Sequence, residues 1–361
     1  MDTLIGLNSE HWMALLRKNF FNIPPSHWGD LLKLTFLSLR NTSFMKKELN
    51  TFGEQIEATE IKEPPIFILG HWRSGTTLLH KLMSNDPQFA YPNIFEVYNP
   101  WTFLTTESLL EERLKNMPAE KRPMDNMVMR YSDPAEDEFA ISLMSLKSPL
   151  IGWALPKQEA YFDRYLTLHN ISEEERQEWK NIFVHFLKKL TLKYQKQLLL
   201  KSPHHTARVK TLLEIFPDAK FIHIRRNPYH VFRSTVSLYL NTVTGLALQK
   251  RDSDQDTEAI INRFAIMYEF FFEERKKIKE NHLTEIAFEE LEKDFEAGLE
   301  KIYQSLNLPG WENFRPILSD YLSKQDKYQK NIYPEIPDKW KKLINEKWKN
   351  VFQEWGYEIE N

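Results

Sequence analysis

The sequence contains no cysteine, which excludes disulfide bonds, a thiolate nucleophile and thiolate metal ligands. It also lacks any apolar run close to the roughly 18 residues that a membrane-spanning helix needs. The opening residues 1–3, Met-Asp-Thr, lack the positive charge typical of a signal peptide. We therefore expect a cytoplasmic protein without a transmembrane segment.

A strong charge of one sign is missing as well. The formal net charge is −3, from 48 basic and 51 acidic residues, so the chain has no basic field of the kind that nucleic-acid binders use. With 361 residues, of which 42% are hydrophobic, the chain is long enough to fill one large α/β core with helical additions. We expect no nucleic-acid partner, and any anion site must be local.

The most informative segment covers residues 65–79. Its first five residues, 65–69, are apolar and predict a buried strand, and a helix is predicted from Thr76 to Ser84. Gly70 and Gly75 lie between them with the spacing of the phosphate-binding loop of nucleoside triphosphatases. The segment therefore predicts a strand, a phosphate-binding turn and a helix start.

This loop departs from the triphosphatase pattern at one position. Thr76 occupies the place of the lysine that contacts the β- and γ-phosphates, and the positive charge lies instead at Arg73. Backbone N–H groups and the helix dipole still favour a phosphate, and a guanidinium offers a planar fork to an oxyanion. We expect an anion to be held by Arg73, Ser74, Gly75, Thr76 and Thr77.

A second segment, residues 219–234, has a similar design. An apolar strand at 221–224 is followed by arginines, an Asn-Pro turn and a helix. Arg226 follows the strand end, and Ser234 comes eight positions later in the helix. Because the carboxyl ends of parallel strands meet at one edge of a sheet, the two segments are expected to serve one ligand.

Together the two segments resemble the sulfotransferase family, over about residues 64–236. The resemblance implies 3′-phosphoadenosine 5′-phosphosulfate as donor, adenosine 3′,5′-bisphosphate as product, and no required metal. In this family the first loop binds the 5′-phosphosulfate, while an arginine and a serine spaced like Arg226 and Ser234 bind the 3′-phosphate. Arg225 remains an alternative to Arg226. The loop is more similar to the tyrosylprotein and Golgi-type branch than to the cytosolic phenol and steroid branch.

The resemblance also implies catalytic residues. Golgi-type members carry a catalytic glutamate shortly after the first helix, and Glu96 stands at the matching place. Aromatic neighbours would raise the pKa of this carboxylate and suit it to general-base work. Cytosolic members use a histidine, so His204, His205 and His71 remain alternative bases. Glu96 could instead cap a helix or form a salt bridge.

A lysine at the end of another apolar strand completes the expected set. Lys201 follows residues 198–200 and resembles the lysine that tyrosylprotein-type members direct at the transferred group, although Ser202 replaces the aspartate of that element. A lysine at the end of a buried strand needs an anionic partner. We expect Lys201 and Arg73 to contribute to catalysis, with a local carboxylate as the alternative partner of Lys201.

Alternating strands and helices predict an α/β fold with a P-loop-type parallel sheet flanked by helices. Further elements are expected as helices at 172–196 and 205–215 and as a strand at 283–288. The C-terminal region is expected to be helical. We divide the chain into a helical N-terminal extension, 1–62, packed on the core, and a sulfotransferase domain, 63–361.

Three segments are open to more than one interpretation. The N-terminal extension could pack on the domain, form an oligomer contact or touch a membrane surface, and packing is favoured. The acidic run 136–138 is interpreted as a solvated helix start, with a role in orienting the acceptor or holding Arg73 as the alternative. In the tail, a solvated helix face is favoured over a nucleotide cover for Lys324, Lys327, Lys330 and Tyr333.

These features predict an enzyme that transfers a sulfuryl group to an acceptor hydroxyl by in-line displacement. We expect a small-molecule acceptor such as an apolar alcohol, a sterol, a lipid or a glycan. A P-loop kinase or NTPase is the first alternative, although Lys201 and Arg226 stand where a magnesium-binding aspartate would be expected. A nucleotide-binding protein without catalytic activity is the second.

Overall fold

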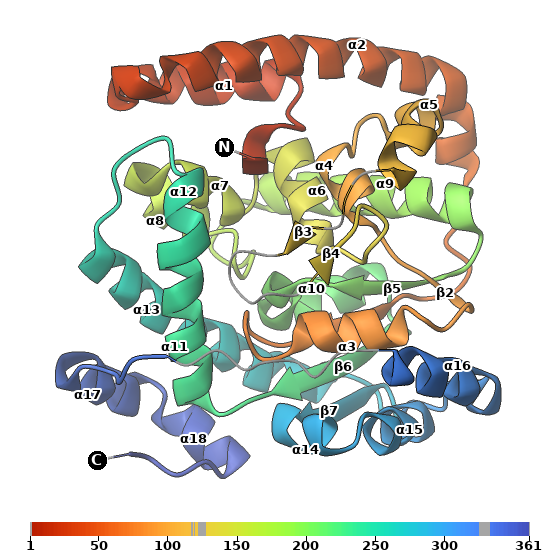
Figure 1. The fold of residues 1–361 in the computed structure, drawn as a ribbon, viewed down its shortest axis with the longest axis vertical. Helices are drawn as coiled ribbons and strands as arrows, with labels where there is room; N and C mark the ends of the chain where they lie inside the picture. Colours follow the sequence, from red (N-terminus) through yellow and green to blue (C-terminus); the bar gives the residue numbers. More distant parts are fainter. Residues whose placement is uncertain (1, 117, 119, 122–127, 325–332, 361) are drawn as a thin grey trace. The chain divides into compact units, whose positions relative to one another are not determined.

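The computed structural model describes residues 2–116, 118, 120–121, 128–324 and 333–360 (Figure 1). The chain divides into two compact units, which we describe separately. The first unit is formed by Met1–Glu63, Ala90–Lys196 and Asn241–Arg251, and the second by Pro64–Phe89, Gln197–Leu240 and Asp252–Asn361.

The sheet of the second unit has the strand order β2-β5-β1-β6-β7. Its strands are β1 (Ile66–Leu69), β2 (Phe89–Ala90), β5 (Gln197–Lys201), β6 (Lys220–Arg225) and β7 (Leu283–Ala287). β1 pairs in parallel with β5 and β6, and β6 pairs in parallel with β7. The segments that follow β1, β5, β6 and β7 therefore leave the sheet at the same edge.

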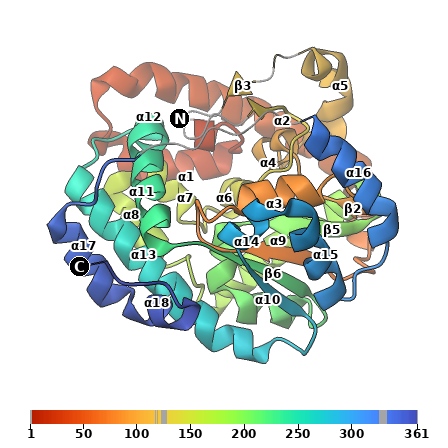
Figure 2. The same cartoon turned by 60° about the horizontal axis from the view of Figure 1, so that its bottom comes forward.

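Helices cover both faces of this sheet. The helices and helical turns of this unit are α3 (Thr76–Met83), η5 (Pro203–Ala207), α10 (Val209–Ile215), α11 (Pro228–Leu238), α13 (Ser253–Glu274), η7 (Arg275–Lys277), α14 (Phe288–Lys293), α15 (Phe295–Ser305), α16 (Trp311–Ser323), α17 (Asp338–Lys347) and α18 (Lys349–Trp355). The π-helical turn η6 (Tyr239–Val243) follows α11 and passes into the first unit. Helices α3, α14 and α15 lie beside the strands (Figure 2).

The core of the second unit explains this arrangement. All four residues of β1 are fully buried, and successive side chains of a strand point to opposite faces. Ile66 and Ile68 pack in one apolar cluster with side chains of α3, α14, α15 and α16. On the other face, the Phe67 ring lies against Phe221 and His205. A strand that is apolar on both faces is what a sheet covered on both sides requires.

The first unit is mainly helical. Its elements are η1 (Asp2–Leu4), α1 (Ser9–Asn19), η2 (Phe20–Asn22), η3 (Pro25–His27), α2 (Trp28–Ala58), α4 (Ile94–Tyr98), α5 (Phe103–Lys115), β3 (Glu120–Lys121), β4 (Val128–Met129), α6 (Asp137–Ser145), α7 (Leu150–Ala154), η4 (Pro156–Gln158), α8 (Glu159–Asp163), α9 (Glu173–Tyr194) and α12 (Thr244–Leu246). β3 and β4 form a two-stranded antiparallel sheet.

A buried ion pair joins two long helices of the first unit. Lys189 on α9 lies 2.5 Å from Glu48 on α2, and both side chains are 2% exposed. The backbone N–H of Thr105 also donates to Glu48 (3.0 Å), and Lys189 also donates to the carbonyl of Pro100. Burial raises the pKa of Glu48 and lowers the pKa of Lys189, so each charge depends on the other.

Most predicted elements are present. The α/β fold with a parallel sheet is confirmed, and the extension is helical, as α1 and α2. The helix predicted at 205–215 begins later, because the 3₁₀ turn η5 precedes α10. Residues 1–63 group with 90–196 in one unit, and the division at residue 62 stays a prediction.

The acidic run at 136–138 corrects one prediction. It does begin a helix, α6, but Asp137 and Glu138 are fully buried rather than solvated. Within the part of the chain that the structure describes, no helix has the length and apolar character of a membrane span.

The buried pair of the first unit gives a test of this packing. We expect Glu48→Gln to lower the free energy of unfolding by about 3 kcal/mol, because it leaves the Lys189 ammonium buried without its partner charge. Urea denaturation followed by circular dichroism measures the change. Glu54→Gln, an exposed change on the same helix, should stay within about 0.5 kcal/mol of the parent. Equal effects of the two substitutions would contradict this account of the pair.

Candidate active site

The loop between β1 and α3 is a tight turn with three residues in left-handed conformations. Gly70, Arg73 and Gly75 have φ angles of 140°, 71° and 104°. A Cβ atom at Gly70 would collide with the carbonyl oxygen of Ile224, and one at Gly75 would collide with the Phe288 ring. Glycine is therefore required at both positions, for its backbone freedom and for the close approach of β6 at Gly70 and of the Phe288 ring at Gly75.

Hydrogen bonds from three directions hold this loop in place. The Gly70 N–H donates to Thr206 Oγ1 (2.8 Å), and the His71 N–H donates to the Tyr268 hydroxyl (3.0 Å). The Ser74 hydroxyl donates back to the carbonyl of His71 (2.8 Å). The loop is thus preorganised, and the first N–H groups of α3 have no partner within the helix, an arrangement that suits an anion.

The structure brings together the side chains predicted from the two separate motifs. Arg73 Nε donates to the Ser234 hydroxyl (2.9 Å), and Arg226 Nη1 donates to the Arg73 carbonyl (3.3 Å). Ser234 also forms a hydrogen bond with the Tyr333 hydroxyl (2.9 Å). Two guanidinium groups and a serine hydroxyl therefore converge at the carboxyl edge of the sheet, where they offer donors to a multiply charged anion.

The side chains of Arg226 and Arg225 lie in different surroundings. The Arg226 guanidinium lies 4.1 Å from the centre of the Phe288 ring, the same ring that approaches Gly75. Burial lowers the pKa of Arg226, against the opposing effect of nearby carboxylates. Arg225 Nη1 instead donates to the Trp355 carbonyl (2.8 Å) in the C-terminal region. Arg226, and not Arg225, is thus the arginine that contacts the loop carrying Arg73 in this geometry.

Lys201 lies at the end of β5 and is 2% exposed. Its ammonium is 3.4 Å from Thr77 Oγ1, at the start of α3. Lys201 therefore adds a third cationic group next to the loop that carries Arg73. The segment that follows, Ser202 to Ala207, is buried and includes Thr206, which supports Gly70.

The three histidines named as alternative bases are buried. His204 Nδ1 lies 3.1 Å from the Ser202 hydroxyl, and its ring meets the Trp72 ring edge to face. His205 packs against Phe67. Burial lowers the pKa of His71 to about 4, so this ring is neutral near pH 7. The rings of His71 and His204 both pack edge to face against the Trp72 ring in the loop.

Glu96 belongs to the first unit, where it is fully buried in α4. Its carboxylate accepts hydrogen bonds from the Asn93 N–H (2.8 Å), Lys193 Nζ (2.6 Å) and the Tyr194 hydroxyl (2.7 Å). Lys193 also pairs with Glu107. Burial is the largest influence and raises the pKa of Glu96, while Lys193 opposes the rise. Glu96 thus caps a helix and forms a salt bridge, as well as having a raised pKa.

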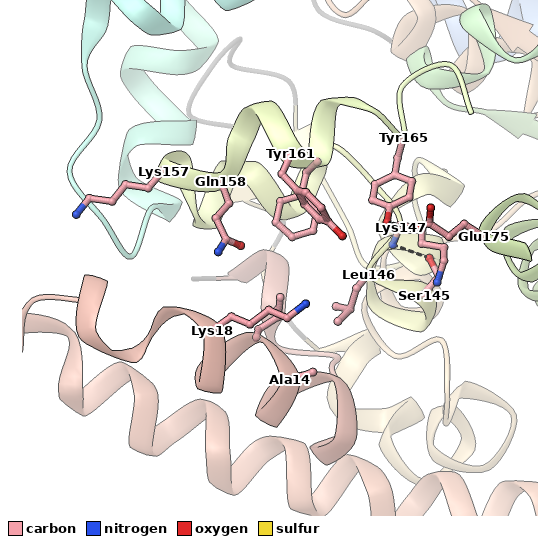
Figure 3. A pocket seen from close by; sticks show the side chains of 12 residues that line it. Ala14, Lys18, Ser145, Leu146, Lys147, Lys157, Gln158, Tyr161, Tyr165 and Glu175 are labelled. Atoms are coloured by element: carbon pink, nitrogen blue, oxygen red, sulfur yellow. Dashed lines mark hydrogen bonds between the residues drawn. The ribbon is translucent and has the colours of Figure 1, made fainter. Parts of the chain in front are cut away.

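A cavity of about 470 Å³ also lies in the first unit (Figure 3). One wall comes from α1, with Ala14 and Lys18, and the other walls carry Lys157, Tyr161 and Tyr165. Its lining is mixed, aromatic and cationic. This cavity shares no residue with the set predicted to hold the donor.

The geometry agrees with the result of sequence comparison. A model of the sulfotransferase family matches residues 64–313, which contain the loop, Lys201, Arg226 and Ser234. The chain belongs to the sulfotransferase family. It is therefore an enzyme of the sulfotransferase class, which decides against the P-loop kinase considered from the loop alone.

Curated relatives match almost the full chain. The sequence is 33% identical, over 354 residues, to the omega-hydroxy-beta-dihydromenaquinone-9 sulfotransferase Stf3 of Mycobacterium bovis and of Mycobacterium tuberculosis. The match covers 98% of this chain and 91% of each relative.

Two solved structures share the fold at low sequence identity. The sulfotransferase STF9 of Mycobacterium avium superposes with a TM-score of 0.72 at 19% identity, covering 94% of this chain and 88% of that one. STF1 of Mycobacterium tuberculosis superposes with a TM-score of 0.64 at 16% identity, covering 94% and 93%.

Sequence reasoning missed the residues that support the loop. Phe288 is the last residue of the strand predicted at 283–288, and a position at the shared carboxyl edge of the sheet is the signal that indicates it. Tyr268 lies inside a long helix and Thr206 in a short turn, so neither had a local signal. Among the tail residues considered, Tyr333 reaches Ser234 and Lys324 pairs with Asp320, while Lys327 and Lys330 lie outside the described residues.

The loop conformation gives the second prediction. We expect Gly75→Ala to lower the free energy of unfolding by about 1–3 kcal/mol, because alanine is strained at this positive φ and its Cβ meets Phe288. Gly53→Ala is the matched control, since a Cβ at Gly53 in the interior of α2 meets nothing within 4 Å. That change should stabilise the protein by about 0.5–1 kcal/mol. A stabilising Gly75→Ala, measured by urea denaturation, would refute the strained loop.

Proposed function

We propose that this sulfotransferase moves the sulfuryl group of 3′-phosphoadenosine 5′-phosphosulfate to the hydroxyl of an apolar, lipid-like acceptor. The observation that carries the proposal is the cluster of Arg73, Arg226 and Ser234, in which the two anion-binding motifs meet. A donor with one charged group at its 5′ end and another at its 3′ position matches two such motifs at one sheet edge.

The proposed donor fits the chemistry of these residues. The N-terminus of α3 with Thr76 and Thr77 suits the 5′-phosphosulfate, and Arg226 with Ser234 suits the 3′-phosphate. The donor supplies an activated sulfonate and a phosphate leaving group. Arg73 and Lys201 would stabilise the negative charge that builds up on these oxygens during transfer.

We propose Glu96 as the general base, with His204 as the alternative. A general base is most effective when its pKa lies near the working pH, and burial raises the pKa of Glu96 in that direction. Its contacts with Lys193, Tyr194 and the Asn93 N–H restrain the carboxylate. The base would take the acceptor's hydroxyl proton as the oxygen attacks sulfur in line with the departing phosphate.

The curated relatives support an apolar acceptor. They are named for a hydroxylated menaquinone derivative, a lipid-like alcohol, and they match 98% of this chain. We therefore place a long-chain alcohol or hydroxylated isoprenoid ahead of a sterol or a glycan as the acceptor class.

A transfer assay with labelled sulfuryl donor tests this function. The enzyme should label a hydroxylated isoprenoid quinol faster than a sterol, a sugar or a tyrosyl peptide. Glu96→Gln should keep donor binding, and its kcat should be lower by about 100-fold or more, on the order of what a general base contributes. The control is Glu107→Gln, which removes the second carboxylate at Lys193 and should retain turnover within a few-fold. Equal turnover of Glu96→Gln and the parent would exclude Glu96 as base.

The pH dependence of the same assay follows from the raised pKa. A base works in its deprotonated form, so kcat should fall as the pH drops through the pKa of Glu96, which lies above the ordinary 4.5. This acidic limb should disappear in the residual activity of Glu96→Gln. Its persistence would favour His204. Failure of the parent enzyme to bind adenosine 3′,5′-bisphosphate would reject the proposed function.

The assignment of the 3′-phosphate gives the next prediction. Arg226→Ala should weaken adenosine 3′,5′-bisphosphate binding by about 1.5–3 kcal/mol, the usual range for a hydrogen bond to a charged group. The loss should vanish for adenosine 5′-monophosphate, which lacks the 3′-phosphate. Arg225→Ala is the neighbouring control, because Arg225 binds the Trp355 carbonyl instead. Calorimetric titration in which Arg225→Ala showed the selective loss would reverse the assignment.

A further inference from the structure

The α1–α2 hairpin exposes an unusual number of large apolar side chains. Phe21 is 96% exposed, Leu32 73% and Phe36 69%. The exposed large apolar side chains on the turn and on α2 are Phe20, Phe21, Trp28, Leu32, Phe36, Leu39 and Leu49. Isolated exposed apolar residues are ordinary, but a contiguous group of them usually marks an interaction surface.

Four of the exposed apolar residues on α2 form one stripe. Trp28, Leu32, Phe36 and Leu39 are spaced by four, four and three residues, which puts them on one side of an α-helix. The buried residues Leu31, Leu34, Ser38 and Asn41 repeat on a different side of the same helix. The core of the first unit therefore uses one face of α2, of mixed apolar and polar residues, and the apolar stripe is exposed to solvent.

The hairpin is firmly held, so this stripe is a fixed surface. Trp12 Nε1 on α1 donates to Thr35 Oγ1 on α2 (2.8 Å), and the Ser9 N–H donates to Thr42 Oγ1 (2.8 Å). The two helices run side by side (Figure 1). At the turn, the Phe20 ring stacks on the Trp28 ring, with centroids 6.3 Å apart. The aromatic turn continues the stripe of α2.

The charge of the hairpin has the opposite sign to that of the whole chain. Residues 9–47, from α1 through the stripe of α2, contain six lysines and arginines and two acidic residues, a net charge of +4. Three glutamates at the end of α2 reduce the net charge of the whole hairpin, 9–58, to +1, against −3 for the whole chain. Lys33, Arg40 and Lys47 are exposed and lie along the flank of the apolar stripe. Apolar and aromatic side chains bordered by basic ones are typical of helices that lie in a membrane interface.

We propose that the α1–α2 hairpin docks this enzyme on an anionic bilayer, with the stripe of α2 and the aromatic turn inserted among the lipids. The basic flank would face the lipid headgroups, whose negative charge complements it. A second copy of the chain is a poorer occupant, because two such hairpins would bring like charges together. The inference goes beyond the proposed function. The two are compatible, because a lipid-like acceptor would be found in the bilayer to which the enzyme docks.

Vesicle co-sedimentation of the full chain tests the proposal without donor or acceptor, so failure of the proposed function does not affect the result. The parent should bind phosphatidylcholine vesicles that contain phosphatidylglycerol. The double variant Leu32→Glu, Leu39→Glu should partition at least about tenfold more weakly, because it removes buried apolar area and adds like charge. The matched control is Ile266→Glu, Ile317→Glu, the same change at two side chains of α13 and α16 that are each 41% exposed.

A third variant tests the basic flank. Lys33→Gln, Arg40→Gln should weaken binding to the anionic vesicles by about fivefold or more, and should have little effect on pure phosphatidylcholine. Unchanged thermal unfolding would show that each variant is folded. Absence of binding by the parent, or equal losses in the Leu32, Leu39 variant and the control, would overturn the proposal. A parent dimer in sedimentation velocity that becomes a monomer on the Leu32, Leu39 change would overturn it in favour of a contact between copies.

Discussion

The parallel pairing of β1 with β6 is the constraint on which the candidate active site depends. Because the two strands run in register, from Ile66 opposite Lys220 to Leu69 opposite His223, the loops that follow them leave the sheet together. Arg73 can then reach Ser234, and Arg226 can reach the backbone of the first loop. The closeness that this pairing imposes leaves no room for a Cβ at Gly70, which lies against Ile224 of the neighbouring strand.

The supporting contacts make the loop rigid before any ligand arrives. Thr206 and Tyr268 accept hydrogen bonds from loop N–H groups. The Phe288 ring packs against Gly75, and the Arg226 guanidinium lies over the same ring. One aromatic side chain thereby links the shape of the loop to the position of the arginine proposed for the 3′-phosphate. Such preorganisation suits a reaction whose catalysis depends on positioning and on stabilising charge.

The first unit uses buried charge in a different way. Glu48 with Lys189, and Glu96 with Lys193, are carboxylates whose burial raises their pKa and whose lysine partners counteract the rise. The first pair joins α2 to α9, and the second restrains the proposed base. The same α2 also presents an apolar stripe to solvent, so one helix combines a structural face with the surface that we propose for lipid.

The parallel sheet, the phosphate-binding type of loop and the family could be predicted from the sequence, because each depends on residues that are close together along the chain. An apolar run, two glycines at a fixed spacing and an arginine eight residues before a serine are short-range patterns, and they indicated the parallel sheet, the loop and the family. The burial of Asp137 and Glu138, and the contacts of Tyr268 and Phe288, were decided only by tertiary structure. These contacts join residues that are distant along the chain, and no local pattern encodes them. Tertiary packing can bury a charged residue at a helix start or bring a helix residue to a loop, whatever its neighbours in sequence suggest.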